Sequence, residues 1–275
     1  MADSYPFLKG HGTENDFVLL PDLDGSVHGD LSARQMAERV RALCDRRAGI
    51  GGDGVLRVLR TDGGWFMDYR NADGSIAEMC GNGIRVFVRH LLEEGLADPA
   101  HPIEVDTRDG VKVLTVDGDL ITADMGRPRV LGDTVVGVGT VSWVARQVDL
   151  GNPHAVAFVD SLDPRGPVGP LLDPPSRDTE AFPDGANVEF VVRRGERHVA
   201  MRVHERGSGE TRSCGTGACA VMVAAAVADG ARPDGADVAY RVDVPGGTLT
   251  VTWTADDRVL LTGPAVIVAR GTTTL

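Results

Sequence analysis

Residues 210–230 read ETRSCGTGACAVMVAAAVADG, and residues 75–95 read SIAEMCGNGIRVFVRHLLEEG. In each stretch a cysteine, Cys214 or Cys80, stands directly before a Gly-x-Gly segment that opens an apolar run. The two cysteines are separated by about half of the chain. A motif that recurs once per half indicates an internal repeat.

The apolar runs predict helices over 82–94 and 216–229, each followed by a glycine that can end it. The second run is apolar on every side, so we expect a buried helix. A third helix is predicted to begin with a capping box formed by Ser32 and Gln35 and to end near Arg47.

Most of the remaining sequence favours strands. Residues 103–125 alternate apolar and polar side chains around Asp-Gly turns, which is typical of a β-meander, and 198–204 and 237–262 follow the same pattern. The Pro- and Gly-rich residues 163–175 predict a surface loop. We therefore expect an α+β protein in which each half is a curved, mainly antiparallel sheet or barrel around one central helix.

The repeat predicts where the halves begin and end. We expect an N-terminal half over 1–126, with 264–275 packing back on it, and a C-terminal half over 127–263. The active site is expected in the cleft between them.

Composition excludes several functions. With 28 basic and 40 acidic residues, the net charge of −12 argues against a nucleic-acid or anionic-membrane partner. Only Lys9 and Lys112 could form a Schiff base, and neither lies in a site-like stretch, so pyridoxal phosphate is not expected. We expect no cofactor and no metal.

The start of the chain carries no pattern of a signal peptide, and the longest apolar run is too short for a membrane span. A cytoplasmic location is expected, in which the four cysteines are reduced thiols.

A helix N-terminus suits both a thiol and a carboxylate. Its free N–H groups and partial positive charge lower the pKa of a thiol from about 8.5 and can hold an anion. Two such ends, one from each half, could hold a carboxylate with a thiol on either side. One sulfur would remove the α-proton and the other would return a proton to the opposite face, which inverts the stereocentre.

Non-catalytic interpretations of the cysteines remain open. A single Cys-Gly-x-Gly is more often a buried structural cysteine, and Cys44 and Cys219 are interpreted as core residues. A zinc site from Cys214, Cys219 and His154 has poor ligand spacing. The reducing compartment disfavours a disulfide between Cys80 and Cys214.

The whole chain resembles the diaminopimelate epimerases, which interconvert LL- and meso-diaminopimelate without a cofactor on the route to lysine and peptidoglycan. The resemblance is carried by HGTENDFV (11–18), GIGGDG (49–54), NADGS (71–75), MCGNGIR (79–85), GNPHAV (151–156), NVEFV (187–191) and ERGSGETRSCGTGACA (205–220). It implies two pseudo-symmetric halves, a small-molecule substrate and a possible homodimer.

The resemblance also implies roles for individual residues. Cys80 and Cys214 would be the acid–base pair, with His154 and Glu205 polarising the thiols. The substrate would be bound by Asn15, Asn71, Gly81, Asn82, Asn152, Asn187, Glu205, Arg206, Gly215 and Thr216. Within this set, the backbone after each cysteine would hold the reacting carboxylate and Arg206 the distal one.

Three positions depart from the family pattern. Glu14 stands where many members have glycine, Gly54 where some have a substrate-binding glutamine, and Ala269 where some have a tyrosine at the dimer contact.

Several alternative functions also remain open. A proline-racemase-like enzyme would have histidine where Asn82 stands and would lack the Glu205-Arg206 pair. A diverged epimerase for a related amino acid would look almost the same, and a phenazine-type isomerase would lack the cysteine pair. A non-catalytic binder would not exchange the α-proton, and a thiol redox sensor would cycle the cysteines through a disulfide.

Overall fold

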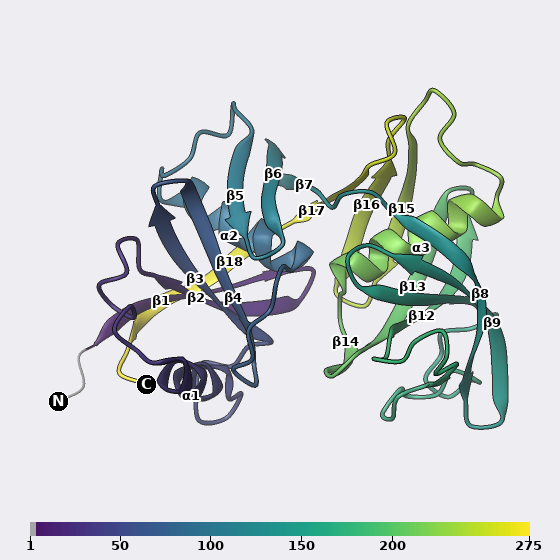
Figure 1. Ribbon diagram of the computed structural model, residues 1–275, viewed down its shortest axis with the longest axis horizontal. Helices are drawn as coiled ribbons and strands as arrows, with labels where there is room; N and C mark the ends of the chain where they lie inside the picture. Colours follow the sequence, from purple (N-terminus) through teal and green to yellow (C-terminus); the bar gives the residue numbers. More distant parts are fainter. Residues whose placement is uncertain (1–3) are drawn as a thin grey trace. The chain divides into compact units, whose positions relative to one another are not determined.

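The structure is a computed structural model that describes residues 4–275. The chain forms two compact units: the chain up to Ala123 together with Gly263–Leu275, and Asp124–Thr262. Each unit is a mainly antiparallel sheet with a buried helix (Figure 1). The predicted α+β class with two similar halves is confirmed.

The first unit has the strand order β18-β1-β2-β3-β4-β5-β6-β7. Only the β2–β3 and β4–β5 neighbours are parallel among these pairs, and α1 and α2 respectively make the two connections. The strands are β1 (Tyr5–Gly12), β2 (Asn15–Pro21), β3 (Gly54–Thr61), β4 (Gly64–Asn71), β5 (Ile103–Thr107), β6 (Gly110–Asp117), β7 (Leu120–Asp124) and β18 (Val266–Thr273).

The second unit repeats this pattern. Its strand order is β11-β8-β9-β10-β12-β13-β15-β16-β17, and again only two pairs in the series are parallel, β10–β12 and β13–β15. The strands are β8 (Arg129–Val138), β9 (Val141–Asp149), β10 (Pro153–Phe158), β11 (Ser176–Arg177), β12 (Asn187–Gly195), β13 (His198–Glu205), β14 (Gly209–Thr211), β15 (Val238–Val244), β16 (Gly247–Trp253) and β17 (Val259–Pro264). Apart from the additional β11–β8 pair in the second unit, the order of antiparallel and parallel pairs is the same in both units, which is the structural form of the predicted repeat.

Helix α1 (Ala33–Cys44) begins with the predicted capping box of Ser32 and Gln35. The predicted end near Arg47 is wrong. The helix stops at Cys44 because Oδ1 of the next residue, Asp45, accepts the Arg47 and Ala48 N–H groups at 2.7 Å and forms a turn.

Helices α2 (Gly81–Glu93) and α3 (Gly215–Ala228) are the central helices of their units. Helix α2 packs against β1 to β4 and β18, and α3 packs against β9, β10, β12, β13, β15 and β16. Figure 1 shows each helix lying along its sheet. As predicted, α3 is buried on nearly every side, because its side chains are almost all small or apolar.

The 163–175 segment is a loop, held down by the buried side chains of Val168 and Leu171. Within residues 4–275, no helix is both long and apolar enough to cross a membrane.

Candidate active site

The residues singled out from the sequence fall into two clusters, one in each unit. The first unit holds Asn15, Asn71, Cys80, Gly81 and Asn82. The second holds Asn152, His154, Asn187, Glu205, Arg206, Cys214, Gly215 and Thr216.

In the first unit, Cys80 is the N-cap residue of α2. Its Sγ accepts the Gly83 N–H at 3.4 Å, and its thiol lies 3.7 Å from Oδ1 of Asn15. The same Oδ1 accepts from Nδ2 of Asn82 at 3.1 Å. The start of β2 and the first turn of α2 are therefore joined by two asparagines next to the thiol.

Two residues that the sequence analysis did not single out hold these asparagines. Oδ2 of Asp53 accepts from Nδ2 of Asn15 at 2.7 Å. The guanidinium of Arg85, which is fully buried, donates to the Gly81 carbonyl and to Oδ1 of Asn82, both at 3.0 Å. Arg85 could have been found in the sequence, because it is a charged residue inside the apolar run of α2. Such a residue indicates a buried charge that is paired with nearby groups.

Asn71 is engaged elsewhere in the same unit. Its Oδ1 accepts from the Tyr69 hydroxyl at 2.9 Å, and its Nδ2 donates to Oγ of Ser75 at 3.0 Å. These contacts stabilise the turn that follows β4. The Asn71 side chain therefore has the turn-forming role that is typical of an Asn-Ala-Asp-Gly segment.

In the second unit, Cys214 is the N-cap residue of α3, and its Sγ accepts the Gly217 N–H at 3.3 Å. Sγ lies 3.5 Å from Oγ1 of Thr216 and forms a hydrogen bond with the carboxyl group of Glu205. The Thr211 hydroxyl also donates to Glu205. Each thiol thus occupies the helix position predicted for it.

The predicted lowering of the thiol pKa is wrong for Cys214. Burial, together with the negative charges of Glu205 and Glu189, raises the pKa of Cys214 well above its ordinary value. The hydrogen bonds from Thr216 and the Gly217 amide act in the opposite direction but are outweighed. Burial also raises the pKa of Glu205. The helix end favours a thiolate, but its surroundings favour the neutral thiol.

His154 belongs to a chain of hydrogen bonds that runs from the interior to Cys214. Its Nδ1 lies 2.6 Å from Oε1 of Glu189, and its Nε2 lies 2.9 Å from Oδ1 of Asn152. Nδ2 of Asn152 donates to Oγ1 of Thr216 at 3.2 Å, and Thr216 contacts the cysteine. Because a carbonyl oxygen only accepts, Nε2 of His154 carries a proton. On the other side of the ring, the 2.6 Å contact fixes Nδ1 against the carboxyl group of Glu189.

Glu189 was missed by the sequence analysis, although it lies within the NVEFV segment quoted there. It is fully buried on β12, and within the part of the chain that the structure describes its Oε2 has no hydrogen-bond partner. A Cβ atom at Gly217 would stand 2.8 Å from its Oε1, so the carboxyl group lies directly against the first turn of α3. A glutamate inside an otherwise apolar strand was the available signal.

Asn187 and Arg206 lie together at the ends of β12 and β13. Oδ1 of Asn187 accepts the Arg206 N–H at 3.0 Å, and Nδ2 of Asn187 donates to the Pro153 carbonyl at 3.3 Å. The Arg206 side chain is exposed and donates to the Asp184 carbonyl at 3.3 Å. The parallel β10–β12 pairing, which places His154 opposite Asn187, brings this group beside the histidine.

The departures from the family pattern have local consequences. Glu14 adopts φ 61°, a left-handed conformation that favours glycine. A Cβ atom at Gly54 would lie 2.5 Å from the Arg70 carbonyl oxygen, so this backbone does not accommodate a glutamine there. Ala269 is exposed on β18. Within residues 4–275, no group of three or more His, Cys, Asp or Glu side chains is placed to hold a metal ion, and the four cysteines form no disulfide.

Comparison with known proteins decides the family. The family model described as diaminopimelate epimerase matches residues 7–131 and 146–268. The chain belongs to the diaminopimelate epimerase family. It is 54% identical to the diaminopimelate epimerase of Streptomyces coelicolor, over 98% of this chain and 96% of that protein. It is 49% identical to the diaminopimelate epimerase of Thermobifida fusca, over 96% of each.

Solved structures of lower identity share the fold of this diaminopimelate epimerase family member. A phenazine biosynthesis protein of the PhzF family from Bacillus anthracis matches with a TM-score of 0.74 at 17% identity, over 98% of this chain and 99% of that one. A hydroxyproline epimerase from Agrobacterium vitis matches with a TM-score of 0.67 at 18% identity, over 98% and 92%. At these identities the likeness shows the fold alone.

Proposed function

We propose that this protein epimerises LL-2,6-diaminopimelate to meso-diaminopimelate, with Cys80 and Cys214 as the two acid–base groups. One observation supports this most. In a chain of the diaminopimelate epimerase family, each unit places a cysteine at the N-cap of its central helix. A reaction that inverts a carbon needs one proton-transferring group for each face of that carbon.

In the proposed reaction, one sulfur acts as a thiolate and takes the proton from the α-carbon. The electron pair of the broken C–H bond is delocalised into the adjacent carboxylate, which the backbone amides of Gly81-Asn82 and Gly215-Thr216 hold. The other sulfur, a thiol, then gives its proton to the opposite face. The carbon is inverted, and the thiol and the thiolate have exchanged places.

The surroundings of Cys214 support the thiol form of this residue before substrate binds. Its hydrogen bond with Glu205 and its raised pKa both favour the protonated form. Cys80 would then be the thiolate before substrate binds, and the two sulfurs would exchange these roles in each turnover. Glu205 and His154 act as the groups that govern the proton of Cys214, the histidine through Asn152 and Thr216.

The proposed recognition of the rest of the substrate uses neutral amides and one arginine. Asn15, Asn82, Asn152 and Asn187 lie next to the thiols or to Arg206 in their own units. Asn71 is kept as a substrate-binding residue, although the turn uses both polar atoms of its side chain as well as its backbone N–H and C=O groups. The exposed Arg206 guanidinium suits a distal carboxylate.

We further propose that the functional halves are 1–126 with 264–275, and 127–263, each supplying one thiol. The protein would act in the cytoplasm, without a cofactor, in lysine and peptidoglycan-precursor biosynthesis. A homodimer is proposed from the family resemblance, and analytical ultracentrifugation would test it.

The first test is to incubate the reduced protein with LL-diaminopimelate in D2O. Deuterium should enter the α-position while the LL/meso ratio moves to equilibrium. Binding without deuterium exchange would overturn the proposal in favour of a non-catalytic binder. Loss of the thiols to a Cys80–Cys214 disulfide under mild oxidant, with no exchange in the reduced protein, would favour the redox-sensor alternative.

The second test separates the two thiols. Cys80→Ser and Cys214→Ser should each lower turnover by at least about 100-fold, because serine is a far weaker acid than cysteine and a poor proton carrier at neutral pH. Cys44→Ala is the matched control, since Cys44 is a core residue of α1 and should be dispensable for catalysis. Near-normal turnover in either serine variant would contradict the two-thiol mechanism.

A further inference from the structure

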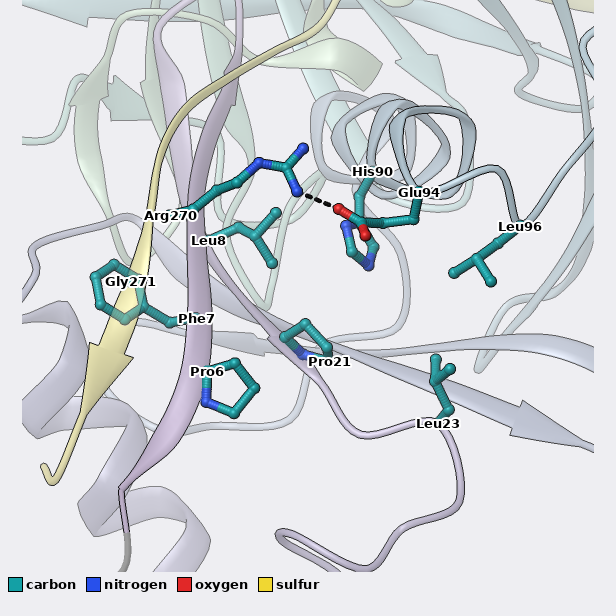
Figure 2. A pocket seen from close by; sticks show the side chains of 10 residues that line it. All are labelled: Pro6, Phe7, Leu8, Pro21, Leu23, His90, Glu94, Leu96, Arg270 and Gly271. Atoms are coloured by element: carbon teal, nitrogen blue, oxygen red, sulfur yellow. Dashed lines mark hydrogen bonds and ion pairs between the residues drawn. The ribbon is translucent and has the colours of Figure 1, made fainter.

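The first unit contains a cavity of about 410 Å³ at the C-terminal end of α2. Figure 2 shows side chains from β1, β2, α2 and β18 around it. Most of its wall is apolar, formed by Pro6, Phe7, Leu8, Pro21, Leu23 and Leu96. The size and the apolar lining are those of small-molecule sites in proteins, which add a few placed polar groups to an apolar wall.

His90 supplies the placed polar group. His90 lines the cavity and is only 2% exposed, and neither of its ring nitrogens has a hydrogen-bond partner among residues 4–275. Burial lowers the pKa of His90, so the ring is neutral, with one donor nitrogen and one acceptor nitrogen. A buried polar group without a partner destabilises the folded protein, and a ligand that forms the missing hydrogen bond would remove this cost.

The charged groups beside the cavity exclude an anionic ligand. Arg270 forms an ion pair with Glu94 (Figure 2) and another, at 2.7 Å, with Glu93, so its positive charge is already neutralised. The three side chains together carry one net negative charge. A carboxylate or phosphate would have to displace a glutamate from the guanidinium, whereas a neutral ligand meets no such cost.

We propose that this cavity binds a neutral, largely apolar small molecule that carries one hydroxyl group, with the hydroxyl hydrogen-bonded to His90. A hydroxyl both donates and accepts, so it can pair with either imidazole nitrogen. The apolar remainder of the ligand would replace water against the six apolar residues of the wall. His90 comes ten residues after the N-cap residue Cys80, so at about 1.5 Å per residue the two lie about 15 Å apart along the axis of α2. The site is therefore separate from the proposed catalytic groups of this unit and does not depend on the proposed function.

The test compares p-cresol with p-xylene, which has nearly the same shape but no hydroxyl. Binding to the full-length protein is measured by calorimetry, and the histidine ring nitrogens are followed by 15N NMR. We expect p-cresol to bind at least about tenfold more tightly than p-xylene, in line with the gain from one satisfied buried group. The His90 ring nitrogens should shift with p-cresol and remain unchanged with p-xylene.

Two variants test the same site. His90→Phe keeps a ring of similar size but removes both nitrogens, so the preference for p-cresol should disappear. Leu96→Trp fills the cavity from the loop after α2 and should abolish binding of both compounds; it keeps the inference testable if the first variant does not fold. Absence of millimolar binding to the wild type, an unchanged His90 signal, or an unchanged preference in His90→Phe would each overturn the proposal.

Discussion

Nδ1 of His154 and Oε1 of Glu189 lie 2.6 Å apart, and neither side chain has any exposed surface. The pair stands at one end of a hydrogen-bonded chain that passes through Asn152 and Thr216 to Cys214. Because a desolvated carboxyl group orients the imidazole strongly, Glu189 acts as a positioning residue for His154.

Glu189→Gln should reduce kcat about 10- to 100-fold while KM changes little. Glutamine has nearly the same shape but no charge, so the imidazole of His154 loses the carboxyl group that orients it. Steady-state kinetics gives kcat and KM separately, and 15N NMR of His154 reports the change in the ring.

The matched control is Glu196→Gln, because Glu196 is exposed in the turn between β12 and β13. It should leave both kinetic constants unchanged. A different outcome would contradict the positioning role of Glu189. In that outcome the His154 ring signals stay the same in both variants, and kcat falls in Glu189→Gln only because less of the protein is folded.

Glu205→Gln should lower the pKa of Cys214. In the folded unit, burial and then the charge of Glu205 are the largest causes of the raised pKa, so removing that charge favours the thiolate. At pH 8 the alkylation of Cys214 by iodoacetamide should therefore become faster, and its pH profile should move to lower pH. Peptide mass spectrometry measures the rate at each cysteine.

Cys44 serves as an internal control in the same digest. Burial raises the pKa of Cys44 to about 12, and Glu205 is not among its causes, so its profile should not move. An unchanged or higher pH midpoint at Cys214 would show that Glu205 does not control this thiol.

Asp53→Ala should reduce kcat/KM about tenfold. The carboxyl group of Asp53 accepts from Nδ2 of Asn15 and from the Asp16 N–H, so its loss frees the asparagine amide beside Cys80 to rotate. A hydrogen bond to a charged group contributes about 1.5–3 kcal/mol, which sets the scale of the loss. Asp62→Ala, in the exposed turn between β3 and β4, should retain full activity. Equal activities of the two variants would contradict the role of Asp53.

The stability of the protein should fall as pH is lowered from about 6.5 to 4, in part through His28. Burial lowers the pKa of His28 to about 4, against an ordinary value of 6.5. Within this window the unfolded chain takes up a proton that the folded chain does not, so the free energy of unfolding decreases as pH falls. Above pH 6.5 both states are neutral at this residue and its contribution is fully present.

Urea denaturation at pH 7 and pH 4.5 measures the difference. His28→Gln should show a smaller decrease between the two pH values than the wild type, while His101→Gln, at an exposed position, should match the wild type. The same decrease in His28→Gln and in the wild type would show that this histidine does not titrate as expected.

Several features could be predicted from the sequence because their physical causes are local. The N-cap positions of Cys80 and Cys214 follow from a glycine pair ahead of an apolar run, and the Ser32–Gln35 capping box depends on four consecutive residues. The β-meander over 103–125 follows from alternation and Asp-Gly turns. The repeat of the two halves was visible for the same reason, since each half carries its own copy of the local signal.

Other features depend on residues far apart in the chain. Parallel pairing of β10 with β12 and the packing of α3 place Glu189 against both His154 and the first turn of α3, and no local pattern specifies these contacts. Likewise, Asp53 reaches Asn15 only because β2 and β3 are neighbours in the sheet. The pKa of Cys214 is the clearest case. The sequence by itself determined that this thiol would stand at a helix N-terminus, which favours the thiolate. Only the tertiary structure decided its protonation, because folding buries the sulfur beside two carboxyl groups whose effect exceeds that of the helix end.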